Sequence, residues 1–214
     1  MCGEIPEAVE ALAAELLPTA SLSAEFRGGR RAAVLIALHG SADDGLRIVF
    51  VEKTAHVRTH AGQVAFPGGT CEETDADPVA AALREAREEA GIAPSSVVPL
   101  GILPTDRTRV ALGGFDVVPV VGWWTGAEPL ASSDHDEIEA IHDLEVDDLL
   151  DPANRLTWTH PRGFTGPGFV VSDLFIWGFT AGLLDALFDC AGWTVPWDKT
   201  RRAPVPPRFM RDNG

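Results

Sequence analysis

One helix constrains this chain more than any other segment. The residues from 78 to 90 read PVAAALREAREEA, a run of strong helix formers with a single proline at its start. Asp77 is placed to cap the helix, Pro78 suits its first turn, and Gly91 suits its end. The sequence therefore predicts a helix over residues 78 to 90 with both ends fixed.

Three carboxylates stand together on this predicted helix. Glu85, Glu88 and Glu89 occupy positions i, i+3 and i+4, which places them on one helical face. Like charges one turn apart destabilise an isolated helix by roughly 0.2 to 0.5 kcal/mol, and a divalent cation reverses that penalty. Mg²⁺ and Mn²⁺ prefer such oxygen ligands. Taken alone, however, a cluster of this kind is more often a solvated helix face, in which Arg84 pairs with Glu88.

The rest of the chain alternates strand and helix patterns, which indicates a mixed α/β class. Residues 1–195 are expected to form a single domain with an N-terminal helix, and the Pro-rich and basic tail 196–214 to continue no helix or interior strand. A hairpin is predicted for 31–40 and 46–53, and a short strand ending in a glycine turn for QVAFPGG. Further strands are expected at 97–103, 115–123 and 137–144, helices at 5–17 and 146–150, and a C-terminal helix whose apolar face is Leu174, Trp177, Ala181, Leu184 and Phe188.

Charge and composition exclude several classes of function. Seventeen basic residues against thirty-two acidic ones give a net charge of -15, which opposes binding to nucleic acid. The most apolar stretch is interrupted by Asp185 and Asp189, so no membrane span is predicted. The three cysteines lack the paired spacing of a disulfide framework or a zinc site, and the acidic N-terminus shows no export signal. Both features favour a cytoplasmic location. An anionic substrate would need local cations or a metal ion.

The segment from Phe66 to Ile92 resembles the Nudix box. FPGG is followed by REAREEAGI, and the matching positions are Arg84, Glu85, Glu88, Glu89, Gly91 and Ile92. Asp75 stands where the first glutamate of the box is expected, Ala86 replaces a larger aliphatic residue, and the spacing from Gly69 to Arg84 is one residue longer. Similar departures occur in the coenzyme A pyrophosphatase branch of the family.

The sequence just upstream resembles the signature of that same branch. VFVEKTAHVRTHAGQVAFPGG matches it through Thr54, Arg58, Gly62 and the FPGG end. Lys53 stands where arginine is usual, which keeps the charge but loses the planar fork of guanidinium. The resemblance covers roughly residues 31 to 190.

The resemblance implies a Nudix-like mixed β-sheet sandwiched between α-helices, and hydrolysis of a pyrophosphate bond with Mg²⁺ or Mn²⁺. Glu85, Glu88 and Glu89 would bind the metal together with the carbonyl oxygen of Gly69. Arg84 would orient the glutamates, although an ordinary surface ion pair is the alternative. Glu137 is the candidate for a further loop carboxylate, with a merely solvated loop equally open. The base that deprotonates water is open among Glu88, Glu89 and Glu137.

The substrate implied by the branch is a small-molecule nucleotide, coenzyme A or a derivative. Lys53, Arg58 and Gly68 are the predicted substrate-binding residues, and a solvated strand end is the alternative for Lys53. The expected products are 3′,5′-ADP and a 4′-phosphopantetheine product. Two other functions are open: a Nudix pyrophosphatase for ADP-ribose or another nucleoside diphosphate derivative, and a non-catalytic module that senses a nucleotide.

Overall fold

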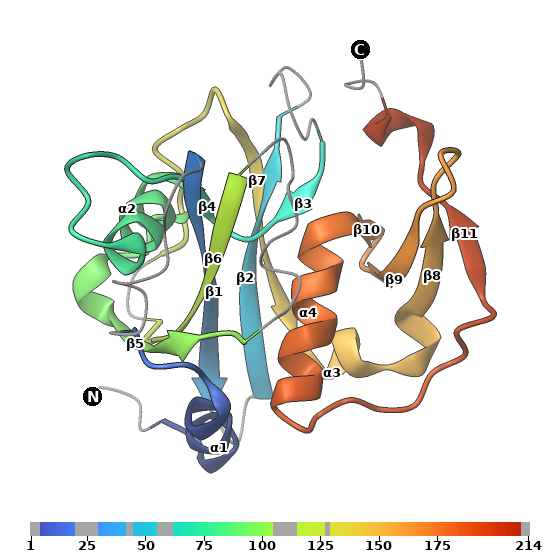
Figure 1. Cartoon of the computed structure of the whole chain (residues 1–214), viewed down its shortest axis with the longest axis horizontal. Helices are drawn as coiled ribbons and strands as arrows, with labels where there is room; N and C mark the ends of the chain where they lie inside the picture. Colours follow the sequence, from blue (N-terminus) through green and yellow to red (C-terminus); the bar gives the residue numbers. More distant parts are fainter. Residues whose placement is uncertain are drawn as a thin grey trace.

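A seven-stranded mixed β-sheet, on the left of Figure 1, is the larger of the two sheets in the described residues. The computed structural model describes residues 5–19, 30–41, 45–54, 62–104, 115–126 and 129–210. The strands run in the order β3-β2-β1-β6-β5, and β4 and β7 pair with β1 and β2 respectively. β1 and β2 form the predicted antiparallel hairpin, whereas β1 and β6 are parallel. The seven strands are β1 (Arg30–Ser41), β2 (Gly45–Lys53), β3 (Val64–Ala65), β4 (Gly68–Thr70), β5 (Val97–Ile102), β6 (Phe115–Trp124) and β7 (Ile138–Glu145).

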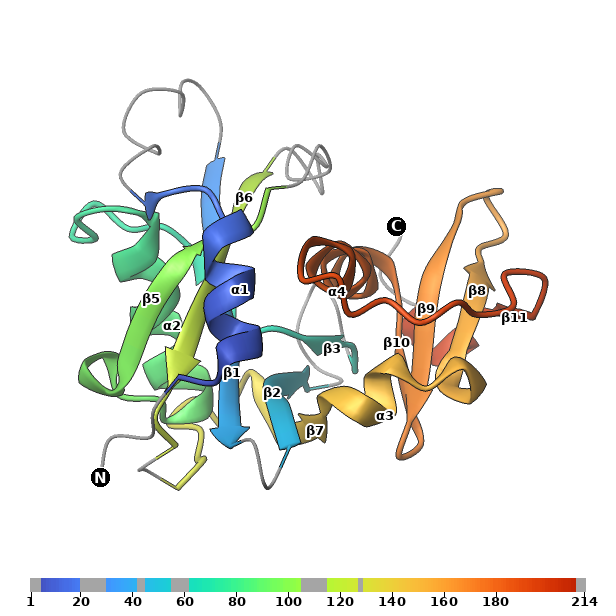
Figure 2. The ribbon, with the colours of Figure 1, turned by 90° about the horizontal axis from the view of Figure 1, so that it is seen from below.

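Helices cover both faces of this sheet, as the sequence predicts. Side chains of β1 alternate between the faces: Leu35 and Ala37 pack with α2, whereas Ile36 and Leu38 belong to the core on the side of α1 and α4. This alternation buries each face under a different helix, and Figure 2 shows α1 lying across the sheet. The helices are α1 (Glu7–Glu15), α2 (Pro78–Ala90), α3 (Val146–Leu150) and α4 (Gly178–Cys190), with short 3₁₀ turns at Pro94–Ser96, Pro152–Asn154 and Pro207–Phe209.

A second sheet that the sequence did not predict packs on the other side of α4 (Figure 1). Its order is β10-β9-β8-β11, formed by β8 (Arg155–Thr159), β9 (Thr165–Val171), β10 (Leu174–Ile176) and β11 (Arg202–Pro204). β11 comes from the Pro-rich tail and pairs in parallel with β8 at the edge of the sheet, where proline is tolerated. The tail thus adds an edge strand.

The C-terminal helix begins later than its apolar periodicity indicates. The prediction that Leu174 and Trp177 lie on this helix was wrong: Leu174 lies in β10, and Trp177 is the residue before the first helical turn at Gly178. The reason is tertiary pairing. Ser172 and Asp173, both at positive φ, turn the chain so that β10 pairs with β9.

Two other boundaries differ from the prediction. The N-terminal helix spans Glu7–Glu15 rather than 5–17, since Pro6 and Leu16 are extended at its two ends. QVAFPGG forms two short strands, β3 and β4, so that both glycines lie in β4 and pair with β1 rather than in an open turn.

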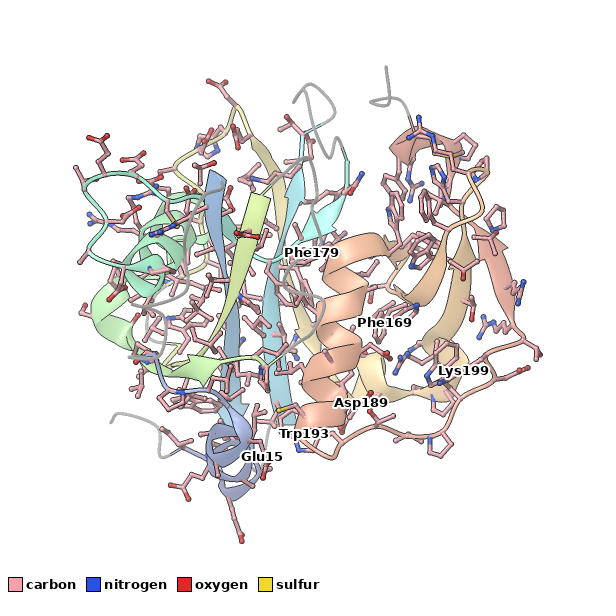
Figure 3. All side chains as sticks on the ribbon, in the orientation of Figure 1. Glu15, Phe169, Phe179, Asp189, Trp193 and Lys199 are labelled. Atoms are coloured by element: carbon pink, nitrogen blue, oxygen red, sulfur yellow. The ribbon has the colours of Figure 1, made fainter. Side chains whose placement is uncertain are left out.

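α4 joins the two sheets into one core. Phe169 of β9, labelled in Figure 3 beside α4, belongs to the same buried cluster as Ile36 of β1 and Leu184 of α4. Cys190, at the end of α4, lies 3.9 Å from the carbonyl oxygen of Glu15 and links α4 to α1. None of the helices in the described ranges is long and apolar enough to cross a membrane.

Candidate functional site

Helix α2 carries the glutamates and is fixed at both ends as predicted. Oδ1 of Asp77 accepts a hydrogen bond from the amide of Ala80 at 2.9 Å, and Gly91 ends the helix in the left-handed region at φ 73°. Ala86 is fully buried against the sheet. The small side chain at this position, a departure from the box, therefore lets the helix pack closely on β1.

Glu89 is the most deeply buried carboxylate of the site, with 3% of the residue exposed. Its Oε2 accepts a hydrogen bond from the backbone amide of Gly68 at 3.0 Å, and its Oε1 accepts one from Nζ of Lys53. Burial raises the pKa of Glu89, while Lys53 and the Gly68 amide act in the opposite direction. Both oxygens of Glu89 are thus held by the protein.

Lys53 ends β2 and bridges two carboxylates. Besides Glu89, its ammonium group lies 3.3 Å from Oε2 of Glu137, and only 14% of the lysine side chain is exposed. Burial alone would lower the pKa of Lys53, but the charges of Glu89 and Glu137 prevail and raise it. Lys53 is therefore positively charged and already paired with Glu89 and Glu137. A substrate phosphate that binds Lys53 would compete with these two carboxylates.

Glu85 lies directly against the FPGG segment. A methyl group on Gly69 would lie 2.5 Å from Oε1 of Glu85, and one on Gly68 would lie 2.4 Å from the carbonyl oxygen of Ala33. At Gly68 only glycine fits, because the backbone of β1 lies in the way, whereas a side chain at Gly69 would displace the carboxylate of Glu85. Burial raises the pKa of Glu85, which Arg84 partly offsets.

Arg84 connects α2 to the loop that precedes it. Its Nε and Nη2 donate to the two carboxylate oxygens of Asp75 at 3.1 and 3.0 Å, and Nη2 also donates to the carbonyl of Thr70. Nη1 donates to Glu85 at 3.0 Å and to Glu88 at 3.4 Å. This bidentate geometry fits the orienting role predicted for Arg84.

Asp75 is a site residue to which sequence reasoning gave no role. Its side chain is only 6% exposed, and the guanidinium of Arg84 holds the pKa of Asp75 below its ordinary value. The signal was its place in the box, where a glutamate is expected. In this chain the shorter aspartate accepts the fork of Arg84.

Glu88 and Glu137 are the two exposed carboxylates, with side chains 50% and 54% exposed. They are brought to the same side by backbone contacts: the amide and hydroxyl of Ser133 both donate to the carbonyl of Glu88, at 2.9 and 3.0 Å. The amide of Thr54 donates to the carbonyl of Glu137 at 2.7 Å. The segment before β7 is thus tied both to α2 and to the end of β2.

The predicted residues therefore converge, with one outside the described ranges. Lys53, Gly68 and Gly69 meet the glutamates of α2, and Glu137 reaches them through Lys53. Arg58 lies outside the described residues. Burial raises the pKa of the nearby Cys71 thiol, so no thiolate chemistry is indicated there.

The donor atoms suit a hard divalent cation. Glu85, Glu88 and Glu89 offer carboxylate oxygens from one helix, and Glu85 occupies the space that a side chain at Gly69 would fill. Within the ranges described above, no group of three or more His, Cys, Asp or Glu side chains is already arranged as a metal site. The contact between Lys53 and Glu89 is consistent with this, because Lys53 already engages Oε1 of Glu89.

Solved structures with a similar fold include two that cover most of this chain. An ADP-ribose pyrophosphatase from Streptococcus suis 89-1591 is 18% identical, with a TM-score of 0.47, over 82% of this chain and 100% of its own. A MutT/nudix family protein from Enterococcus faecalis is 18% identical, with a TM-score of 0.48, over 77% of this chain and 62% of its own.

Sequence comparison defines the family. The family model described as NUDIX domain matches residues 29–165, more than half of the chain. A protein described as "Uncharacterized Nudix hydrolase NudL" from Escherichia coli (strain K12) is 37% identical over 173 residues, which are 78% of this chain and 85% of the relative. With the box glutamates placed on α2 against the FPGG segment, this chain belongs to the Nudix hydrolase family.

Proposed function

We propose that this chain is a metal-dependent pyrophosphohydrolase that cleaves coenzyme A or a derivative into 3′,5′-ADP and a 4′-phosphopantetheine product. Nudix hydrolases generally use divalent ions such as Mg²⁺ or Mn²⁺. The single observation that supports catalysis most is the convergence of two glutamates on two glycines: the buried Glu89 accepts from the amide of Gly68, and the partly buried Glu85 lies against Gly69.

The site can bind an anionic substrate only if the negative charge of its own carboxylates is neutralised. Glu85, Glu88, Glu89 and Glu137 gather within reach of Lys53 or Arg84, in a chain whose net charge is already -15. A divalent cation held by Glu85, Glu88, Glu89 and the Gly69 carbonyl would neutralise this charge and would lower the pKa of a water. Two protein cations alone would leave the site repelling a diphosphate.

The chain's own residues divide the remaining work. Arg84 fixes Glu85 and Glu88 by donating from one nitrogen to both, while its fork rests on Asp75. Lys53 holds Glu89 in place and keeps Glu137 nearby. Glu137 and Glu88, whose side chains are about half exposed, are our candidates to accept a proton from the attacking water.

Coenzyme A is proposed as the substrate because of the residues that lead into FPGG. Thr54, Arg58 and Gly62 match the upstream signature of the coenzyme A pyrophosphatase branch, and Lys53 keeps the charge at its position. A diphosphate with an additional 3′-phosphate offers these cations more contacts than ADP-ribose does.

The test is product analysis with purified protein. The protein is incubated with Mg²⁺ or Mn²⁺ and, separately, with coenzyme A, dephospho-coenzyme A and ADP-ribose, with Glu89→Gln and a chelator as controls. Preferential release of 3′,5′-ADP from coenzyme A is the expected result. Turnover of ADP-ribose alone would keep the reaction class and overturn the substrate. Absence of all turnover would overturn catalysis and favour nucleotide sensing.

A further inference from the structure

The C-terminal arm, residues 197–210, is firmly attached to the second sheet. β11 pairs with β8, and the amide of Val205 donates to the carbonyl of Thr159 at 2.9 Å. Val205 and Phe209 are 1% and 5% exposed and share a small core with Leu156 and Phe175. The arm is therefore packed as an integral part of the fold up to Phe209.

Phe209 lies near the end of this arm, inside an aromatic cluster. Its ring stacks on Phe175, with centroids 6.4 Å apart and an interplanar angle of 24°, and lies 6.3 Å from the ring of Trp177. Trp177 in turn makes an edge contact with Trp158 at 5.6 Å. Such aromatic contacts fix the position and tilt of the Phe209 ring.

The same ring faces Gly62, a turn residue just before β3 of the first sheet. A methyl group on Gly62 would lie 3.7 and 3.9 Å from two carbons of the Phe209 ring, so the glycine and the ring are close neighbours. Gly62 adopts φ 66°, a conformation that glycine allows readily. β10, adjacent to the cluster, also lies against β3, which follows Gly62. The second sheet thus packs against the segment from Gly62 to β3, which leads into FPGG.

Gly62 is hydrogen-bonded to the residue that holds Glu89. The amide of Gly62 donates to the carbonyl of Lys53 at 2.9 Å, and the amide of Lys53 donates to the carbonyl of Gln63 at 3.1 Å. The next amide, that of Thr54, binds the carbonyl of Glu137. A shift of Gly62 would therefore move the backbone from which Lys53 reaches Glu89 and Glu137.

We propose that Phe209 is a positioning residue for the active site, acting through Gly62 on Lys53. The C-terminal sheet supplies a rigid wall, and the Phe209 ring limits how far Gly62 can move outward. Backbone held in this way keeps the Lys53 ammonium between its two carboxylates. The kinetic part of this inference rests on the proposed function, whereas the structural part does not.

The first test measures amide exchange residue by residue by NMR on the full-length protein. Phe209→Ala is compared with Phe209→Leu and with Leu156→Ala, which truncates the same small core from β8. We expect exchange at the amides of Gly62 and Lys53 to accelerate on the order of tenfold in Phe209→Ala, beyond any increase in Leu156→Ala, with most of the protection restored in Phe209→Leu. Unchanged exchange at both amides, or an equal increase in Leu156→Ala, would overturn the inference.

The second test measures kcat and KM with the diphosphate substrate that product analysis identifies. Phe209→Ala is expected to raise KM severalfold, because Lys53 is a proposed substrate contact and loses its position, whereas a smaller folded fraction would lower kcat and leave KM unchanged. Leu156→Ala is expected to keep the KM of the unmodified protein. If the chain turns over no substrate, the proposed function fails while the exchange experiment still decides the role of Phe209.

Discussion

Lys53 and Glu89, 36 residues apart in the chain, form an ion pair in which Nζ of the lysine donates to Oε1 of the glutamate. The pair joins the end of β2 to the last turn of α2, and both side chains are largely buried. Because the other oxygen of Glu89 binds Gly68, one carboxylate links three parts of the site. The predictions for activity depend on this relationship.

Replacing Glu89 by glutamine is expected to lower kcat by on the order of 10²- to 10³-fold, because the amide removes a charge from the centre of the site. Glutamine can still accept from the Gly68 amide, so the variant should remain folded. Steady-state kinetics with Mg²⁺ and a thermal melt check both points. Glu10→Gln, on the exposed face of α1, is the matched control. A Glu89→Gln enzyme with nearly unchanged kcat would contradict the assignment.

Two substitutions of Lys53, one that keeps the positive charge and one that removes it, test the role of its ion pair with Glu89. Lys53→Arg keeps a cation for Glu89 and should retain activity within a few-fold, whereas Lys53→Met leaves a buried carboxylate without its partner. The methionine variant is expected to lose roughly 1 to 3 kcal/mol of unfolding free energy, measured by urea titration in metal-free buffer. Equal stability of the two variants would show that the ion pair contributes nothing to folding.

Substitutions of Arg84 test whether activity requires the planar, bidentate guanidinium group. Lysine at this position cannot donate to both oxygens of Asp75 and also to Glu85 and Glu88, so Arg84→Lys should lower kcat roughly 10- to 100-fold. Asp75→Asn, which keeps the shape of the side chain but removes its charge, should have a smaller effect in the same direction. Arg87→Lys, on the exposed side of α2, is the control. Full activity in Arg84→Lys would contradict an orienting role.

Asp143, which lies outside the candidate site, should make the stability of the fold depend on pH. Its Oδ1 lies 2.8 Å from Nε2 of His39, and its Oδ2 accepts from Nε of Arg47 at 3.0 Å. Burial alone would raise the pKa of Asp143, but these hydrogen bonds and charges prevail and hold it below the ordinary value. The ionised Asp143 therefore stabilises the fold fully at pH values above the pKa that Asp143 has in the unfolded chain. This contribution is lost as the pH falls through the lower pKa that Asp143 has in the folded protein.

The check compares unfolding free energies of the unmodified protein and Asp143→Asn between about pH 6 and about pH 2. The difference should be largest at the upper end and shrink as Asp143 is protonated. Asp148→Asn, at an exposed position of α3, should show no such trend. A difference that stays constant over the whole range would contradict the account.

Local patterns in the sequence determined helix α2 and the family. Asp77, Pro78 and Gly91 act on neighbouring backbone groups, so their effects are readable from spacing alone, and the helix bounds were confirmed. The β1–β2 hairpin was also predicted correctly, because two apolar strand runs separated by turn-forming residues are a local signal.

Only the tertiary structure decided which distant residues meet. The partners of Glu89 lie 36 and 21 residues away, and no periodicity encodes that Lys53 would face it from β2. The same holds for the second sheet: the pattern from Leu174 onward fits a helix, but pairing of β10 with β9 overrides it. Helix caps and faces act within a turn or two of chain, whereas ion pairs and sheet edges depend on how separate elements pack. The sequence therefore indicated Glu89, Lys53 and Gly68 as site residues, but only the structure showed that Lys53 and Gly68 bond to Glu89.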